Sequence, residues 1–206
     1  ELSEILKKDQ SKQEDLDVVL AIEKILRAME ATRELSHLRV DSRNYGGELY
    51  RTQSEWRHAS KIQIPDKHKH LDLLPKLKAY CLNVLGTLEI TRYTSDKGKD
   101  TSFLDAANKM FEESRNVNPL FSAPISNLGL TQQYRIEHEL RLHKTKIDYE
   151  HVFKSYTAAY ENFKKATKYA ENPKRKGVAY NNLLDNRLKV SRLYLKQGNV
   201  QMYKTC

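Results

Sequence analysis

Hydrophobic residues recur along the N-terminal part of this chain at intervals of three and four, the spacing that places side chains on one face of an α-helix. The first stripe is formed by Val19, Ile22, Leu26, Met29 and Arg33. It predicts a helix from about residue 15 to residue 38, with acidic residues suited to its electropositive first turn. Residues 7–14 are almost wholly polar, and we expect residues 1–14 to form a flexible N-terminal segment.

The next part of the chain predicts shorter helices separated by turns. The sequence Asn44-Tyr45-Gly46-Gly47 is typical of a turn, and a helix is predicted for residues 48–61. Pro65 and Pro75 interrupt the following stretch, so residues 15–74 are predicted to form a helical pair and a connector. Further helices are predicted for residues 75–93 and 103–117, followed by a second connector over residues 120–127.

The C-terminal part predicts three more helices and no strands. A long helix is expected from about Leu128, with a break near Asp148. The stripe after the break contains Phe153, Tyr156, Phe163 and other aromatic or small residues, and Asn172-Pro173 ends it. The last helix is expected from near residue 178 to residue 198, with Leu184, Leu188 and Leu195 among its apolar positions. The predicted fold class is all-α.

Three segments of the chain share one order of residues. In the first, Leu82-x-x-Leu85-Gly86 is followed by Ala107-x-x-x-Phe111 and Asn118-Pro119. In the second, Ile125-x-x-Leu128-Gly129 is followed by Ala159-x-x-x-Phe163 and Asn172-Pro173. The third opens with Ala179-Tyr180-Asn181-Asn182-Leu183-Leu184 and reaches residues 193–199.

This order resembles the tetratricopeptide repeat (TPR), whose pattern W-x2-L-G-x2-Y…A-x3-F…P describes two antiparallel helices. The resemblance implies TPR-like repeats over residues 75–206, stacked as antiparallel hairpins in a right-handed superhelix or a helical bundle. Leu82 and Ile125 stand where the family has Trp, and the Leu-Gly pairs lie 43 residues apart instead of about 34. We therefore expect degenerate repeats with long helices, the last repeat being truncated after its first helix.

Composition narrows the classes of protein that the chain can belong to. Of its 206 residues, 39% are apolar and 31% charged, and the longest aliphatic run, residues 18–22, is too short to span a membrane. Cys81 and Cys206 are too few and too far apart for a disulfide framework, so we expect the cytoplasm or another reducing compartment. Because the chain begins at Glu1 and not at Met, we expect a fragment of a longer protein.

The catalytic and metal-binding motifs that the sequence suggests are all incomplete. We therefore predict no enzymatic activity, no cofactor and no metal site. His138 and His143 are five residues apart, whereas a zinc-protease helix needs a spacing of four. Alternating Asp and His over residues 66–72 suit a metal only weakly, because lysines interleave with them. Gly98-Lys99 lacks the remainder of a phosphate loop, and Cys81 lies among apolar residues as a packed thiol does.

The net positive charge of the chain is confined to its C-terminal quarter. Residues 154–206 hold 12 Lys and Arg against three acidic residues, a net charge of +9, whereas residues 1–153 hold 24 of each sign. One group of cations forms a predicted basic patch near the end of the helix that carries the aromatic stripe. This patch consists of Lys164, Lys165, Lys168, Lys174, Arg175 and Lys176. Such a local excess of positive charge bears on which partners the chain binds and not on its fold.

The TPR resemblance implies a binding site, because the first helix of each repeat lines a concave groove in that family. By this resemblance the groove candidates are Asn127, Arg135, Asn182, Arg187, Lys189, Arg192 and Lys196. Asparagines in such grooves bind peptide backbone, and cations bind acidic groups. We therefore expect a non-enzymatic interaction module, an adaptor or regulatory domain, that binds a peptide or protein segment of acidic character.

Three other interpretations of the basic face remain open. The cations, together with Tyr160, Tyr169, Tyr180 and Tyr194, also suit RNA, because they supply phosphate contacts and stacking surfaces. An anionic membrane surface is a further possible partner. A solvated helix face without any partner is the alternative to all of these.

Overall fold

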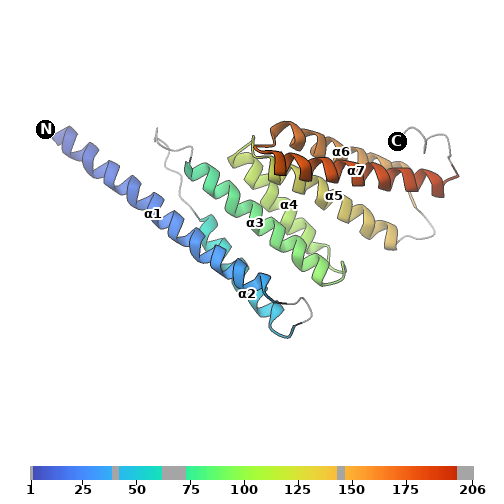
Figure 1. Ribbon diagram of the computed structural model, residues 1–206, viewed down its shortest axis with the longest axis horizontal. Coiled ribbons are helices and arrows are strands. Elements are labelled where there is room, and N and C mark those ends of the chain that lie inside the picture. The colour runs from blue at the N-terminus through green and yellow to red at the C-terminus, as the bar shows by residue number, and fades with distance from the viewer. Residues whose placement is uncertain (1, 39–41, 62–72, 143–146, 199–206) are drawn as a thin grey trace.

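The computed structural model describes residues 2–38, 42–61, 73–142 and 147–198, with side chains from Val19 onward (Figure 1). Seven helices make up these ranges: α1 (Leu2–Ser36), α2 (Tyr45–Ser60), α3 (Leu73–Ser95), α4 (Ser102–Val117), α5 (Ser122–Leu142), α6 (Tyr149–Tyr169) and α7 (Pro173–Lys196). The described residues contain no strand. The all-α prediction is confirmed.

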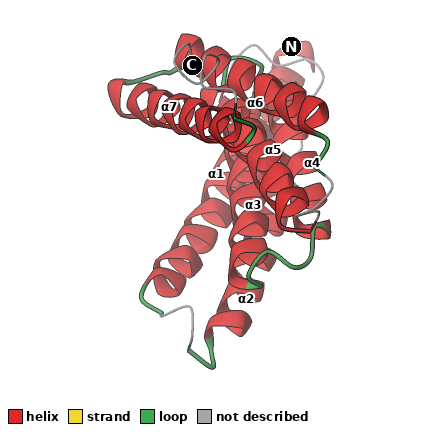
Figure 2. Ribbon diagram, turned by 90° about the vertical axis from the view of Figure 1, so that its right-hand side faces the viewer, coloured by secondary structure: helices red, strands yellow, loops and turns green. Residues whose placement is uncertain are grey.

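The helices pack in successive pairs and form two layers. Helices α1, α3, α5 and α7 contact one another in that order, and we call them the inner layer. Helices α2, α4 and α6 each contact the inner helices before and after them and, within the described ranges, do not contact one another. Helix α1 lies at one end of this stack and α7 at the other (Figure 1). Figure 2 shows the α7 axis at a steep angle to α1 and α3.

Local capping explains where the C-terminal helices begin. The break predicted near Asp148 is confirmed, because the Asp148 side chain accepts a hydrogen bond of 3.1 Å from the His151 backbone amide at the start of α6. Asn172 likewise caps α7 by accepting a bond of 2.9 Å from the Arg175 amide. Pro173 follows this cap in the first turn, where its missing N–H costs nothing.

Three helix starts differ from the predicted ones. Lys174, Arg175 and Lys176 lie in the first turn of α7 and not at the end of the preceding helix, because Asn172 and Pro173 begin a new helix. Helix α5 begins at Ser122, six residues before the predicted start, because a proline in the first turn does not interrupt a helix. Helix α1 begins at Leu2 and not near residue 15, since its polar residues are mostly good helix formers.

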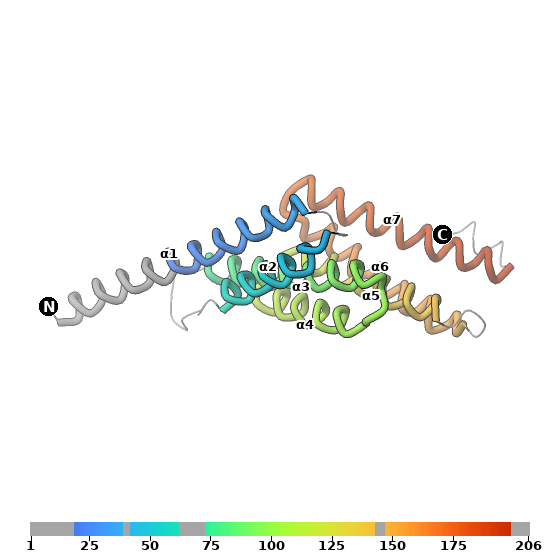
Figure 3. Tube along the Cα trace, turned by 90° about the horizontal axis from the view of Figure 1, so that it is seen from below, coloured from blue at the N-terminus to red at the C-terminus, as the bar shows by residue number. Residues whose placement is uncertain are grey.

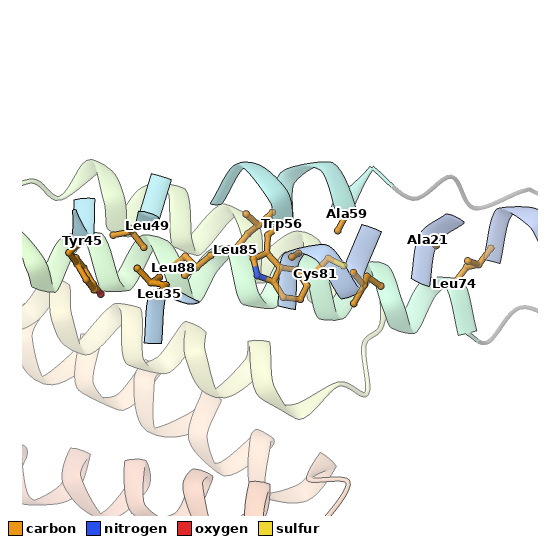
Figure 4. Close-up of a cluster of buried hydrophobic side chains, with 12 residues drawn as sticks. Ala21, Leu35, Tyr45, Leu49, Trp56, Ala59, Leu74, Cys81, Leu85 and Leu88 are labelled. Atoms are coloured by element: carbon orange, nitrogen blue, oxygen red, sulfur yellow. The ribbon is translucent and has the colours of Figure 1, made fainter. Parts of the chain in front are cut away.

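One hydrophobic cluster joins the first three helices (Figure 4). Trp56 of α2 is 1% exposed, its Nε1 donates to Thr32 Oγ1 of α1 at 2.8 Å, and its ring meets Tyr80 of α3 edge to face at 5.7 Å. Cys81 is a free thiol within the cluster, and burial raises its pKa to about 12. The sequence-based interpretation of Cys81 as a packed thiol is confirmed.

The repeated glycines and phenylalanines meet within each of the next two pairs. A Cβ added at Gly86 of α3 would lie 2.5 Å from Phe111 Cε1 of α4, closer than two carbon atoms approach. At Gly129 of α5 it would lie 2.8 Å from Phe163 Cε1 of α6. Both phenylalanines are fully buried. The repeated motif therefore marks equivalent positions of close helix packing in α3–α4 and α5–α6.

The apolar stripes of the two end helices do not form their packing faces. On α1 the buried face consists mainly of alanines, with Ile25 and Leu35, whereas Val19 and Leu26 of the sequence-identified stripe are 58% and 59% exposed. On α7 the buried positions include Asn186, whereas Leu188 is 56% exposed. Small residues face inward because they allow the helices to approach closely, so the larger residues face outward.

Candidate partner-binding site

Asparagines connect neighbouring helices of the inner layer. Asn127 of α5 donates through Nδ2 to Asn83 Oδ1 of α3 at 3.0 Å. Asn182 of α7 donates to Ser126 Oγ of α5 at 3.1 Å. Both predicted groove asparagines lie on adjacent inner helices, and each bonds to a side chain of the neighbouring helix.

Two cavities lie where the starts of α3, α5 and α7 come together, and Arg175 lines both. The cavity of about 410 Å³ is lined by Ser122, Ala123, Ser126, Asn127, Ala166, Asn172, Lys174, Arg175, Val178 and Ala179. The cavity of about 610 Å³ is lined by Lys76, Tyr80, Asn118, Leu120, Phe121, Glu171 and Arg175. We call the pair the Arg175 cavities. They bring together one predicted asparagine, Asn127, and two members of the predicted basic patch, Lys174 and Arg175.

A carboxylate is already bound at the wall of these cavities. The Ser122 amide donates to Glu171 Oε1 at 2.9 Å, and the Ser122 hydroxyl donates to Glu171 Oε2, also at 2.9 Å. Arg175 Nε lies 3.3 Å from the same Oε2. The guanidinium of Arg175 also lies over the Phe121 ring, 5.0 Å from its centroid. The first turn of α5 and Arg175 therefore have the geometry to bind a carboxylate.

Apolar side chains beside this polar wall remain open to solvent. Leu120, in the loop before α5, is 64% exposed, and Val178, in the second turn of α7, is 52% exposed. A few placed polar groups beside apolar side chains are the usual composition of a ligand-binding surface. The Arg175 cavities therefore offer both charge recognition and apolar contact.

Three of the predicted groove cations have partners within the chain. Arg135 forms an ion pair with Asp105 of α4, and the Arg187 guanidinium lies 5.4 Å from the Tyr160 ring centroid of α6. Lys189 Nζ lies 2.7 Å from Glu137 Oε1 and 2.7 Å from Asp185 Oδ2. Burial opposes the charge of Lys189, but these two carboxylates outweigh it and raise the lysine pKa. These three side chains hold helices together.

The other predicted cations are exposed. Arg192 and Lys196 lie on α7, and within the described ranges neither forms an ion pair. Lys164, Lys165 and Lys168 lie on exposed positions of α6, with Lys168 Nζ 5.8 Å from the Tyr169 ring centroid, and Lys176 is exposed on the first turn of α7. None of these six lines the Arg175 cavities. Two members of the predicted basic patch, Lys174 and Arg175, thus line the cavities, whereas the other four lie on open surface.

Among the described residues no group of three or more His, Cys, Asp and Glu side chains is placed to hold a metal ion. The His138 ring Nδ1 lies 2.9 Å from the Gly98 carbonyl oxygen, which gives the ring a structural role. Residues 66–72, His143 and Cys206 lie outside the described residues. No helix in the part of the chain that the structure describes is long and apolar enough to cross a membrane.

Sequence reasoning missed several side chains of the Arg175 cavities. Ser122 and Glu171 are 49 residues apart, and Leu120 and Phe121 lie in a segment predicted as a plain connector. One available signal was Asn172-Pro173, which is a helix-start pattern and would have placed Glu171 at the end of one helix and Arg175 in the first turn of the next.

The comparisons with known proteins identify no relative. No protein-family model, no curated protein and no solved structure matches this chain.

Proposed function

We propose that the chain is a non-enzymatic, TPR-like interaction module that binds an acidic peptide or protein segment at the Arg175 cavities. The observation that carries the proposal is the bound carboxylate of Glu171, held by the first turn of α5 and by Arg175 beside exposed Leu120 and Val178. A partner that offers Asp or Glu next to an apolar residue matches these groups.

The close packing of Gly86 with Phe111 and of Gly129 with Phe163 supports the TPR-like assignment. In the repeat pattern these residues belong to two helices of one hairpin. The continuous inner layer of first helices, α1, α3, α5 and α7, also agrees with a stack of such hairpins.

Electrostatics favour an acidic partner at the Arg175 cavities. Lys174 lines one of the cavities beside the Arg175–Glu171 ion pair and adds a positive charge to its wall. The starts of α5 and α7 add the partial positive charge of helix N-termini. A further cavity of about 490 Å³, between α2 and the end of α3, is lined by Asp96 and other acidic and neutral groups with one arginine, so it lacks this preference.

The experiment is a fluorescence-anisotropy titration of the chain with a library of short acidic peptides. We expect micromolar binding that weakens about tenfold or more in Lys174→Glu, because that change puts a negative charge on the cavity wall. Lys164→Glu is the matched control, since it makes the same charge change at an exposed site outside the cavities.

Single-stranded RNA and duplex DNA are titrated in parallel at the same ionic strength. Equal weakening by Lys174→Glu and Lys164→Glu would show general charge attraction and overturn the assigned site. RNA binding tighter than any peptide, with no peptide hits, would favour the nucleic-acid alternative and overturn the proposed function.

A further inference from the structure

Helix α7 buries the less apolar of its two faces. Its buried positions are Ala179, Asn186 and Leu193, which are 2%, 1% and 5% exposed. The buried Asn186 amide is hydrogen-bonded there, because its Nδ2 donates to the Tyr156 carbonyl of α6 at 3.2 Å. The face toward α5 and α6 is therefore built from one alanine, one asparagine and one leucine.

The opposite face of α7 is a stripe of large apolar side chains. Leu188 and Leu195 each follow a buried position by two residues, a rotation of about 200° around the helix. The stripe consists of Tyr180, Leu184, Leu188 and Leu195, which are 48%, 56%, 56% and 44% exposed. In Figure 3 α7 runs along an outer edge of the molecule, with the other described helices to one side. Several large apolar side chains exposed on one face of a helix are typical of an interaction surface.

Cations border the stripe on both sides. Arg187 lies on the edge toward α6, where its guanidinium meets Tyr160, and Arg192 and Lys196 lie on the other edge. The acidic residue of α7, Asp185, is bound by Lys189 at 2.7 Å. The stripe is thus flanked by positive charge without a competing free carboxylate on the helix.

We propose that the outer face of α7 docks an amphipathic helix of another protein, whose apolar stripe is flanked by Asp and Glu. Apolar positions at helical spacing fit the apolar side of such a helix, and the flanking cations fit its acidic edges. This inference does not depend on the Arg175 cavities, which lie around the first turns of the same helix.

Helix α1, at the other end of the stack, differs from α7 in the charges beside its exposed apolar residues. Helix α1 also exposes apolar residues, but its nearby arginines are paired within the helix, Arg27 with Glu23 and Arg33 with Glu30. Its exposed stripe therefore lacks the charge that would select one class of partner. Leu26 on α1 is 59% exposed and so matches Leu188 as a control position.

The test uses two fluorescent helical peptides with identical leucine positions, one with Glu and one with Lys on both flanks. We expect the Glu peptide to bind at least about tenfold more tightly than the Lys peptide, and Leu188→Glu to weaken it by a similar factor. Leu26→Glu is expected to leave binding unchanged. Circular dichroism of both variants verifies that these exposed substitutions leave the fold intact.

Three results would overturn the inference. The first is the absence of binding by the Glu peptide, and the second is equal weakening by Leu188→Glu and Leu26→Glu. The third is a dimer, seen by sedimentation of the chain alone, that Leu188→Glu dissociates, because a second copy would then cover the face. None of these results bears on the acidic-peptide titration, whose decisive variant is at Lys174.

Discussion

Substituting Gly86 by Ala tests whether the repeated glycines mark obligatory close packing. At an open helical position this change stabilises a protein by up to about 1 kcal/mol, because alanine has the higher helix propensity. Gly177 of α7 is such a position, since a Cβ there meets no atom within 4 Å. Gly177→Ala is therefore the matched control.

At Gly86 the new methyl group meets the ring of Phe111, with contacts of 2.5, 2.8 and 2.8 Å. Carbon atoms prefer separations of about 3.5–4.0 Å, so the ring must move by about 1 Å. Phe111 is 0% exposed and its neighbours leave it little space. Overpacking of this kind costs about 1–3 kcal/mol, which exceeds the propensity gain. We expect Gly86→Ala to lower the unfolding free energy by about 1 kcal/mol, about 2 kcal/mol below Gly177→Ala.

Urea denaturation followed by far-UV circular dichroism measures these differences. In a chain of this size each kcal/mol also shifts the melting temperature by about 2–4 °C. A double-mutant cycle with Phe111→Leu identifies the cause, because the smaller side chain removes the clash, and we expect a favourable coupling of about 1–2 kcal/mol. If Gly86→Ala stabilises the chain as much as Gly177→Ala does, the packing argument is wrong.

Three further predictions concern the interior. Asn127→Ala leaves Asn83 Oδ1 without its donor, and urea denaturation should show a loss of about 1–2 kcal/mol; an unchanged midpoint would contradict the bond. In a Cys206→Ser background, Ellman's reagent should label Cys81 only after unfolding, because burial raises its pKa to about 12; rapid native labelling would refute the burial. Burial likewise raises the Tyr156 pKa from 10.0 to about 12, so the native state keeps a proton that the unfolded state loses above pH 10. Unfolding free energy should therefore fall as the pH rises from about 10 to about 12, and the fall should be shallower in Tyr156→Phe.

The sequence predicted the architecture where local signals and packing agree. The Leu-Gly and Ala-x-x-x-Phe pairs identified both central hairpins because one physical requirement, close approach of two helices, selects small residues at fixed positions. The break near Asp148 was predicted although no Gly or Pro lies between Thr131 and Asn172, and in the structure the Asp148 side chain caps the helix that follows it. Periodicity alone was sufficient for the fold class.

Periodicity did not predict which face of an end helix is buried. In α7 the regular leucines Leu184, Leu188 and Leu195 are exposed, whereas Asn186 is buried. The choice depends on the neighbouring helices, which admit small and hydrogen-bonding side chains, and a single helix sequence contains no information about them. The candidate site was only partly predictable for a similar reason, because Lys189 of α7 acquires a second carboxylate partner, Glu137 of α5, only through tertiary structure.

The central claim is that an acidic segment binds at the Arg175 cavities, and zero-length carbodiimide cross-linking tests it most directly. The reagent joins a carboxylate of a bound peptide to a lysine amine in contact with it. Mass spectrometry should then find the peptide attached chiefly to Lys174, which lines a cavity. Attachment spread evenly over Lys164, Lys165 and Lys196, with no preference for Lys174, would contradict the account.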